Sequence, residues 1–335
     1  MTIRESMEQR EVEYLSPYAC LSKNSKGRRR EEEPCDIRPV FQRDRDRILH
    51  CKAFRRLKDK TQVFLAPEGD HYRTRLTHTL EVSQNARTIA KALRLNEDLV
   101  EAIALGHDLG HTPFGHAGER ALNGVCSLGF IHSEQSVRTV DVLEKDGIGL
   151  NLTEEVRDGI RNHQTANVPS TLEGKIVRLS DKIAYIHHDM DDAIRAGLLR
   201  EEDVPGSIGD VLGYTTRERL DHFIHDIVTT SAGKNDIVMS EPVSRALSEL
   251  RSFLFENVYQ NPVAKSEEGK AEGLVETLFW YYMKHIDLLP AEFLGLMESQ
   301  GTPREQIVCD YVGAMTDRFA IARYEEIYIP RTWQG

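Results

Sequence analysis

Residues 104–122 concentrate side chains that can bind a metal or move a proton. The stretch ALGHDLGHTPFGHAGERAL lies between two apolar runs and carries five such groups: His107, Asp108, His111, His116 and Glu119. A buried histidine must find hydrogen-bond partners or lose its charge, so it is a poor filler for an apolar helix. The density of titratable groups therefore predicts a functional site.

The spacing separates these groups into two sets. Residues four apart in a helix lie nearly in line, so His107 and His111 share a face. Asp108 adjoins His107, and both can reach one ion from the end of a helix. The glycine, threonine and proline that follow weaken the helix and predict a turn. His116 and Glu119 are three apart, so they meet on the next helix, where the carboxylate prepares the imidazole as a general acid.

Composition bounds the class of protein. The chain has 335 residues, of which 40% are hydrophobic and 29% charged, as expected of a globular protein. Its first residues are charged, and no run approaches about eighteen apolar residues, so we expect a cytoplasmic protein without a membrane span. The five cysteines include no CxxC pair. The net charge of -11 repels polyanions, so an anionic substrate would require local cations or a metal.

The pattern of apolar residues predicts an all-α fold with one small β-hairpin at 61–76. We expect a loosely ordered N-terminal segment over 1–37, a helical core over 38–200 and a C-terminal helical region over 201–335 packed on that core. Asn96 is predicted to cap the helix that begins at the next residue. The basic residues Arg55, Arg56, Lys58 and Lys60 are most simply a solvated face, with contact to phosphate or an effector as the alternative.

A His–Asp pair supplies only half of a typical metal site, because transition metals usually take about four ligands from histidine and carboxylate. Two further candidates lie on other apolar helices, His78 in RTRLTHTLEV and Asp181 in VRLSDKIAYIHHDMDD. In chain order the set is His78, His107, Asp108 and Asp181. This H…HD…D order resembles the HD superfamily of metal-dependent phosphohydrolases.

Longer stretches resemble one family within that group, the deoxyguanosinetriphosphate triphosphohydrolase-like proteins. They are FQRDRDRILHCKAFRRLKDKTQVF, RTRLTHTLEVSQNARTIA, HDLGHTPFGHAGE, FIHSEQSVR and SDKIAYIHHDMDDAIRAGL, with weaker likeness in DYVGAMTDRFA at 310–320. The resemblance implies an HD-type phosphohydrolase core over 38–200.

The resemblance also implies a role for each matching position. The metal ligands are His78, His107, Asp108 and Asp181. His116 and Glu119 match the catalytic pair, and His111 and His132 match histidines that contact the phosphates. The implied substrate contacts are Gln62 and Val63 at the sugar edge, Arg75 and Lys182 on the phosphates, Tyr185 beneath the deoxyribose and Asp189 on the 3′-hydroxyl. Asp181, Tyr185 and Asp189 also step four residues at a time along one helix face.

The implied reaction converts a dNTP and water into a deoxynucleoside and inorganic triphosphate, by attack at the α-phosphorus. Two nitrogen and two carboxylate ligands suit Mn²⁺ first, with Fe²⁺, Co²⁺, Ni²⁺ or Zn²⁺ as alternatives and Mg²⁺ accompanying the nucleotide. Relatives assemble as tetramers or hexamers with nucleotide or single-stranded DNA effectors, so a homo-oligomer of dimers is expected. The sequence does not indicate the preferred base.

Two other functions stay open. One is a different HD phosphohydrolase, such as a 5′-nucleotidase or a cyclic-nucleotide phosphodiesterase, which would release orthophosphate or a monophosphate. The other is a nucleotide-sensing or DNA-binding module on an HD scaffold, although a sensor need not keep His116 and Glu119. His163 and His188 could be functional, but packing or surface roles are the simpler interpretation.

Overall fold

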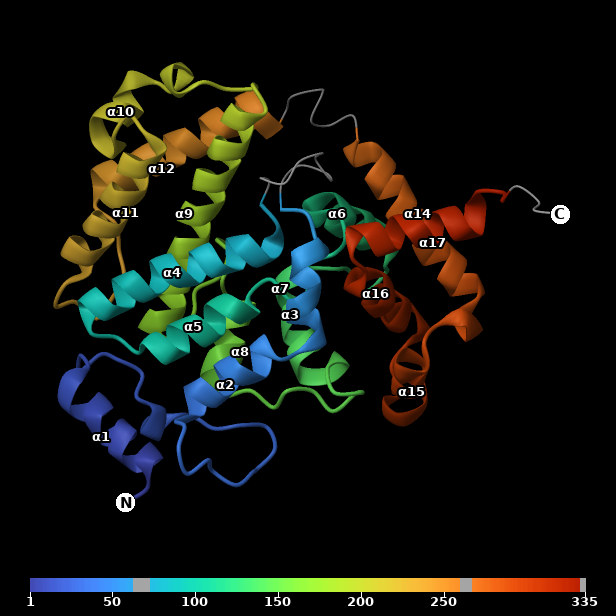
Figure 1. Ribbon diagram of the computed structural model, residues 1–335, viewed down its shortest axis with the longest axis horizontal. Coiled ribbons are helices and arrows are strands. Elements are labelled where there is room, and N and C mark those ends of the chain that lie inside the picture. The colour runs from blue at the N-terminus through green and yellow to red at the C-terminus, as the bar shows by residue number, and fades with distance from the viewer. Residues whose placement is uncertain (63–72, 260–266, 332–335) are drawn as a thin grey trace.

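The computed structural model describes residues 1–62, 73–259 and 267–331, and these residues fold into helices joined by loops (Figure 1). Within those ranges extended pairing is limited to two isolated antiparallel bridges, Arg28 with Thr153 and Thr61 with Thr74. The predicted all-α class is confirmed. The turn of the predicted hairpin lies outside the described residues, and Thr61 and Thr74 pair at its two ends.

One group of helices packs around a first hydrophobic cluster, on the left of Figure 1. Its helices are α2 (Val40–Leu49), α3 (Lys52–Arg56), α4 (Arg75–Leu93), α5 (Glu97–Gly106), α8 (Glu154–Arg161), α9 (Leu172–Arg195), α10 (Gly206–Leu212), α11 (Thr216–Ser231) and α12 (Glu241–Leu254). Helices α4, α5 and α9 contact one another at its centre.

The central helices form where their sequences place apolar residues at helical spacing between good caps. Ile89 of α4, Ile103 of α5 and Val177 of α9 are fully buried in the first cluster. The side chain of Asn96 accepts a hydrogen bond from the backbone N–H of Leu99, so the predicted cap of α5 is confirmed. These caps and buried faces hold α4, α5 and α9 in fixed register.

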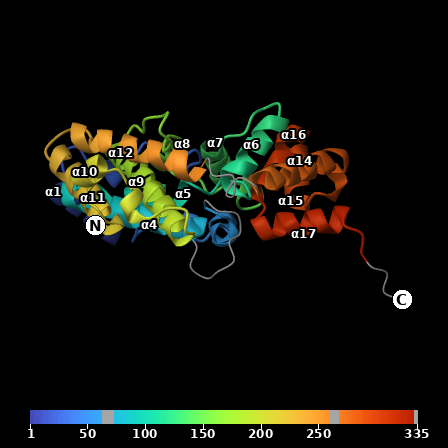
Figure 2. The ribbon, with the colours of Figure 1, turned by 90° about the horizontal axis from the view of Figure 1, so that it is seen from above.

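A second hydrophobic cluster lies on the right of Figure 1, and Figure 2 shows the two groups side by side along the long axis of the molecule. Its helices are α6 (Gly115–Val125), α14 (Glu268–Lys284), α15 (Ala291–Gln300), α16 (Arg304–Ala314) and α17 (Asp317–Tyr328). Helix α6 belongs to this group although α5 precedes it in the chain, because its apolar face packs on α14. Helix α7 (His132–Arg138) lies between the groups.

Short helical turns complete the architecture. Turns of 3₁₀ type span Ser22–Asn24, Leu57–Asp59, Glu201–Asp203 and Ile286–Leu288, and π-helical turns span Thr139–Leu143 and Phe255–Tyr259. None of the described helices combines the length and the apolar character needed to cross a lipid bilayer.

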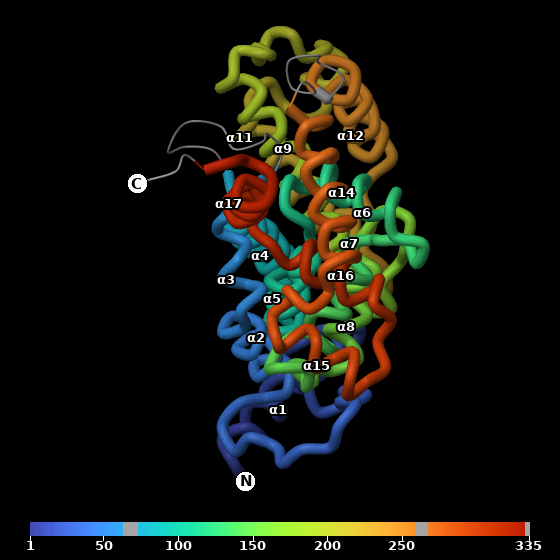
Figure 3. The backbone as a smooth tube through the Cα atoms, turned by 90° about the vertical axis from the view of Figure 1, so that its right-hand side faces the viewer, coloured from blue at the N-terminus to red at the C-terminus, as the bar shows by residue number. Residues whose placement is uncertain are grey.

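The N-terminal segment contains a helix that the sequence analysis missed, α1 (Ile3–Tyr14), at the lower end of Figure 3. Thr2 and Glu5 form a capping box at its start. Its apolar residues do not gather on one face, so periodicity could not reveal it. The following residues are tied to the core by buried carboxylates: Glu173 accepts from the backbone N–H of Cys20, and Glu155 from that of Lys26. The domain limits themselves stay a prediction.

Candidate active site

A cavity of about 340 Å³ gathers most of the residues that the sequence analysis singled out. Its walls come from α4, α9, the turn before α6, the start of α7 and the end of α12. The lining includes Gln62, Arg75, His78, Asp108, His111, His116, His132, His163, Gln164, Arg178, Asp181, Lys182, Tyr185 and Arg251.

The four predicted metal ligands converge at one end of this cavity. His78 Nε2 lies 3.1 Å from Asp181 Oδ1, and His107 Nε2 lies 3.6 Å from the same oxygen. His107 Nε2 is also 3.4 Å from Asp108 Oδ1. The long helices α4 and α9 supply His78 and Asp181, and the C-terminal end of α5 presents the other two. The arrangement points two ring nitrogens and two carboxylates at one position.

Hydrogen bonds on the far side of each ring leave the inner nitrogens available to an ion. His107 Nδ1 donates to the carbonyl of Ala104 at 2.7 Å, so in the neutral ring Nε2 carries the lone pair that an ion would use. Without an ion, burial is outweighed by Asp108 and Asp181, which raise the pKa of His107 to about 9, so a bound cation would replace the proton on Nε2. Nε2 is buried and has no hydrogen-bond partner, which is costly unless a cation binds there. His78 Nδ1 lies 3.2 Å from His188 Nδ1, and the other nitrogen of His188 contacts the carboxylate of Glu81. His188, for which packing was the simpler interpretation, therefore holds a predicted ligand.

The electrostatics of the cluster also suit a divalent cation. Burial opposes ionisation of Asp108, but His107 and Arg75 outweigh burial and hold its pKa well below the usual range. The pKa of Asp181 is likewise well below its usual range despite burial, because the rings of His107 and His78 face its carboxylate, with His78 Nε2 at 3.1 Å. Two ionised carboxylates beside the unpartnered nitrogen of His107 fit the donor set of a transition metal. His78, His107 and Asp108 together form one of the groups whose ligand atoms lie close enough to share an ion.

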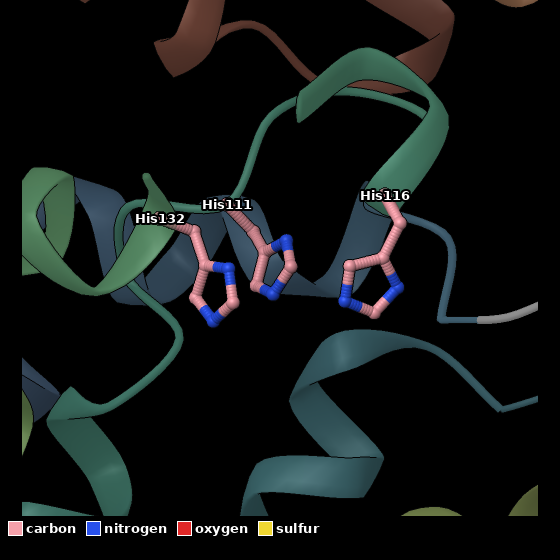
Figure 4. Close-up of side chains that lie close together, drawn as sticks. All are labelled: His111, His116 and His132. Atoms are coloured by element: carbon pink, nitrogen blue, oxygen red, sulfur yellow. The ribbon is translucent and has the colours of Figure 1, made fainter. Parts of the chain in front are cut away.

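Three histidines form the neighbouring wall, and Figure 4 shows their rings side by side with His111 in the middle. The rings of His111 and His132 stack with centroids 3.8 Å apart, and the ring of His116 stands 5.4 Å from that of His111. Of the three, only His116 has a substantial solvent-exposed part, although protein atoms lining the cavity surround its ring closely enough to desolvate it. Gly115, the residue before His116, lets the backbone lie close to Arg75. Its φ is 57°, and an added Cβ would meet Arg75 Nη2 at 3.2 Å.

Glu119 pairs with a different histidine from the one expected. Its carboxylate accepts from the backbone N–H of His132 at 2.9 Å and from Nδ1 of the same residue at 2.9 Å. Among the described residues no hydrogen bond joins Glu119 to His116, so the direct contact expected from their spacing is not found, and their role as a catalytic pair stays a prediction. Three-residue spacing places His116 and Glu119 on one face of α6, but the start of α7 offers Glu119 two donors from one residue.

His163 belongs to the same network, which the sequence analysis did not predict. Its Nδ1 donates to the carbonyl of Ile160 at 2.7 Å, so Nε2 faces His132 Nε2 at 3.3 Å. Gln164 places its amide nitrogen 3.2 Å from that same atom of His132. The polar Asn-His-Gln run directly after the amphipathic helix α8 was the available signal, but the sequence does not show which way the ring of His163 points.

Positive charge gathers in the cavity although the chain is acidic. Arg75 donates from Nη1 to Asp108 Oδ2 at 2.6 Å, while its buried Nε and Nη2 atoms have no partner. Burial, together with Arg251 and Arg178, lowers the pKa of Lys182. Arg178 and Arg251 were not predicted: the first lies one turn before Asp181 on α9, and the second arrives from α12. The cavity thus offers several cationic groups to an anionic ligand.

The predicted sugar contacts divide into three cases. Gln62 lines the cavity, and its buried Oε1 has no hydrogen-bond partner. Tyr185 also lines the cavity, whereas Asp189 is buried behind it and is hydrogen-bonded to the tyrosine side chain. Burial raises the pKa of Asp189 well above its usual range. Val63 lies outside the described residues.

The sequence of this chain matches two known domains and is similar to known proteins along nearly its whole length. Residues 75–186 match the HD domain, and residues 237–326 match the phosphohydrolase-associated domain. A deoxyguanosinetriphosphate triphosphohydrolase-like protein of Caldanaerobacter subterraneus is 58% identical over 99% of this chain and 98% of its own. Proteins of the same name from Desulfatibacillum aliphaticivorans and Clostridium perfringens are 52% and 48% identical, over 98% and 99% of this chain and 99% of each of theirs.

These relatives match nearly end to end, so the likeness includes both matched domains. The matched HD domain contains the four converging ligands. This domain, together with the names of the relatives, indicates an enzyme that hydrolyses phosphate esters. The chain belongs to the deoxyguanosinetriphosphate triphosphohydrolase-like family of HD-domain phosphohydrolases.

Proposed function

We propose that the protein is a metal-dependent dNTP triphosphohydrolase, which converts dGTP, and other dNTPs to an extent set by base recognition, into deoxynucleoside and inorganic triphosphate. One observation carries the proposal: a single cavity joins the His–His–Asp–Asp cluster to a wall of histidines and to the unpartnered nitrogens of Arg75. The first group suits a hydrolytic metal, and the second suits a polyphosphate.

His78, His107, Asp108 and Asp181 would hold a divalent cation, whose chemistry is to lower the pKa of a water and offset phosphate charge. Mn²⁺ fits the mixed nitrogen and carboxylate set best, with Mg²⁺ accompanying the triphosphate. Arg75 and Lys182, which line the same cavity, would bind the phosphates. Because Arg75 also bonds Asp108, it ties the position of the phosphates to the position of the ligand cluster.

A proton must reach the 5′-oxygen as it leaves the α-phosphorus, and His116 is our proposed acid. Desolvation and the positive charge of Arg75 lower the pKa of His116 to about 4, so it is neutral in the free enzyme near pH 7. A bound triphosphate brings negative charge and favours the protonated ring. His132, fixed through Glu119, would donate from Nε2 to a phosphate oxygen in its protonated form.

Tyr185 and Asp189 would favour deoxyribose over ribose. The ring of Tyr185 forms part of the cavity wall and its side chain is anchored by Asp189, so an additional 2′-hydroxyl would meet a side chain that cannot easily move aside. We also propose a cytoplasmic homo-oligomer, a tetramer or hexamer built of dimers, with a dNTP or single-stranded DNA as effector. Sedimentation with and without each effector tests that assembly.

Product analysis decides the reaction. Metal-loaded protein is incubated with each dNTP alone and with all four mixed, and the products are separated by ion-exchange chromatography. Equal amounts of deoxynucleoside and inorganic triphosphate are expected. Release of orthophosphate from a monophosphate, or opening of a cyclic nucleotide, would instead identify another phosphohydrolase. Binding of dNTPs without turnover under every metal would identify a sensor.

A further inference from the structure

Asp317, at the start of α17, links the C-terminal helices to two segments that carry active-site residues. This side chain is buried, with 4% of its surface exposed. Its Oδ1 accepts from the backbone N–H of Phe114 at 2.9 Å. Its Oδ2 accepts from the backbone N–H of Thr61 at 3.0 Å and also from the hydroxyl of Thr61. One residue of α17 thus holds two separate segments of the first 120 residues.

Both segments carry residues of the cavity wall. Phe114 lies between His111 and His116, and its φ of 62° is in the left-handed region, which a non-glycine residue adopts only when its surroundings enforce it. Thr61 directly precedes Gln62. Its antiparallel bridge with Thr74 places it beside the start of α4, which carries Arg75.

Lys60 makes a second connection at the same place. Its side chain, predicted to be solvated, is buried and donates from Nζ to the carbonyl of Gly313 in α16 at 2.9 Å. The same Nζ atom donates to the carbonyl of His111. The carbonyl of Lys60 accepts from the backbone N–H of Arg75 at 3.1 Å. Residues 60 and 61 are therefore held between α16, α17, the histidine turn and α4.

We propose that Asp317 is a positioning residue through which the phosphohydrolase-associated domain sets the geometry of the catalytic turn and of Gln62. The catalytic part of this inference rests on the proposed function, but the mechanical part does not. A carboxylate is needed because three donors point at two oxygens. Asparagine has the same shape but one acceptor oxygen, and its NH₂ group would face a donor from either Thr61 or Phe114.

The test compares Asp317→Asn with Asp310→Asn. Asp310 is also a buried aspartate of the second group, and it accepts hydrogen bonds from the side chains of Arg138 and Gln135 on α7. Both variants lose charge-assisted bonds across the same interface. Displacement of reacting groups by about 1 Å can cost on the order of 100-fold in rate. We expect kcat to fall about tenfold to 100-fold in Asp317→Asn with metal content unchanged, and to stay within about twofold in Asp310→Asn.

Hydrogen exchange supplies a readout that does not depend on substrate. Exchange in peptides covering residues 107–118 should accelerate in nucleotide-free Asp317→Asn and not in Asp310→Asn. Unchanged exchange there, or kcat losses in both variants that simply follow their losses of stability, would overturn the proposal. If the wild type hydrolyses no dNTP but exchange still separates the variants, the proposed function fails while the positioning role stands.

A milder pair of variants serves if Asp317→Asn does not fold. Thr61→Val removes the hydroxyl donor next to Gln62 and leaves the bond to Phe114 intact, and Thr61→Ser keeps the hydroxyl. We expect Thr61→Val to raise KM more than it lowers kcat, and Thr61→Ser to restore KM. Equal KM values in the two variants would count against the Oδ2 contact as a determinant of site geometry.

Discussion

The two walls of the cavity are held in place in different ways. The ligand wall, His78, His107, Asp108 and Asp181, rests on α4, α5 and α9, whose apolar faces pack together in the first cluster. The histidine wall, His111, His116, Glu119 and His132, comes from a turn, from α6 of the second group and from the start of α7, which lies between the groups. Packed helices fix ligands by burial, whereas the turn depends on a few directed hydrogen bonds. The first wall should tolerate changes outside itself, whereas the second should respond to changes at the residues that hold its turn, Asp317 and Thr61.

Loss of a ligand should have the largest effect. Asp108→Ala removes one carboxylate from the cluster, so an ion would have only the two histidine nitrogens and the carboxylate of Asp181 as ligands. We expect metal content, by elemental analysis, and dNTP hydrolysis to fall together to background, while circular dichroism keeps its helical signal. Asp98→Ala is the control and should retain both, because Asp98 lies in the first turn of α5 and pairs with Arg45, away from the ligand cluster at the other end of the helix. Full metal occupancy in Asp108→Ala would remove this residue from the ligand wall.

Changes in the histidine wall should come next and should show which groups act as one unit. Removal of a general acid costs about 10²–10⁴ in rate, so His116→Ala should lower kcat by that order with metal content unchanged. Glu119→Gln should cost less. Because Glu119 bonds His132, its effect should nearly vanish in a His132→Ala background and persist in a His116→Ala background. The reverse pattern would restore the pairing expected from helix spacing.

A leaving-group test separates the two histidines further. A substrate analogue with a more acidic 5′ leaving group needs less protonation, so it should recover much of the rate lost in His116→Ala. It should recover little of the rate lost in His132→Ala, where the phosphate contact is missing. Equal recovery in both variants would mean that the two rings share one role.

Sugar selectivity should respond more modestly. Tyr185→Ala opens the cavity wall where a 2′-hydroxyl would lie, so the preference for dGTP over GTP, measured as a ratio of kcat/KM values, should shrink by about tenfold or more. Tyr214→Ala, an exposed tyrosine near α10, is the matched control. Equal turnover of GTP and dGTP by the wild type would contradict the steric explanation.

The smallest effect concerns stability and pH. Burial lowers the pKa of Lys60 to about 7, so between about pH 7 and pH 10 the unfolded chain holds a proton on Lys60 that the folded chain has lost. Stability relative to Lys60→Met should therefore rise with pH in that window by up to about 1.4 kcal/mol per pH unit, and stay constant below it. Denaturant unfolding of both proteins at pH 6, 7, 8 and 9 measures the difference. Parallel curves would show that Lys60 is charged in the folded protein.

The ligand wall could be predicted from the sequence because its information is local. His107 and Asp108 end an apolar helix, and the faces of α4 and α9 were visible in the spacing of their apolar residues. When these helices pack against one another, their buried faces bring the four predicted ligands together. The cap at Asn96 was predictable for the same reason, since it depends on a contact three residues away.

The histidine wall was harder to predict from the sequence because its contacts join segments that are distant in the chain. The partner of Glu119 is thirteen residues away on another helix, and the burial of Lys60 depends on Gly313. Spacing within one helix gives no information about such partners. His163 and His188 were underestimated for a related reason: their importance comes from the direction of one ring nitrogen, which tertiary packing decides.

The placement of α6 has a consequence for how the protein is made. This helix carries His116 and Glu119, yet its apolar face packs on α14, which begins at Glu268. At translation rates of about 5–20 residues per second, α6 waits on the order of ten seconds for its partner to be synthesised. During that interval its buried face, with Ala117, Ala121 and Leu122, has no cover from α14. We therefore expect activity to appear only after α14 has been synthesised, and a nascent chain stalled before α14 to leave the apolar face of α6 exposed to solvent.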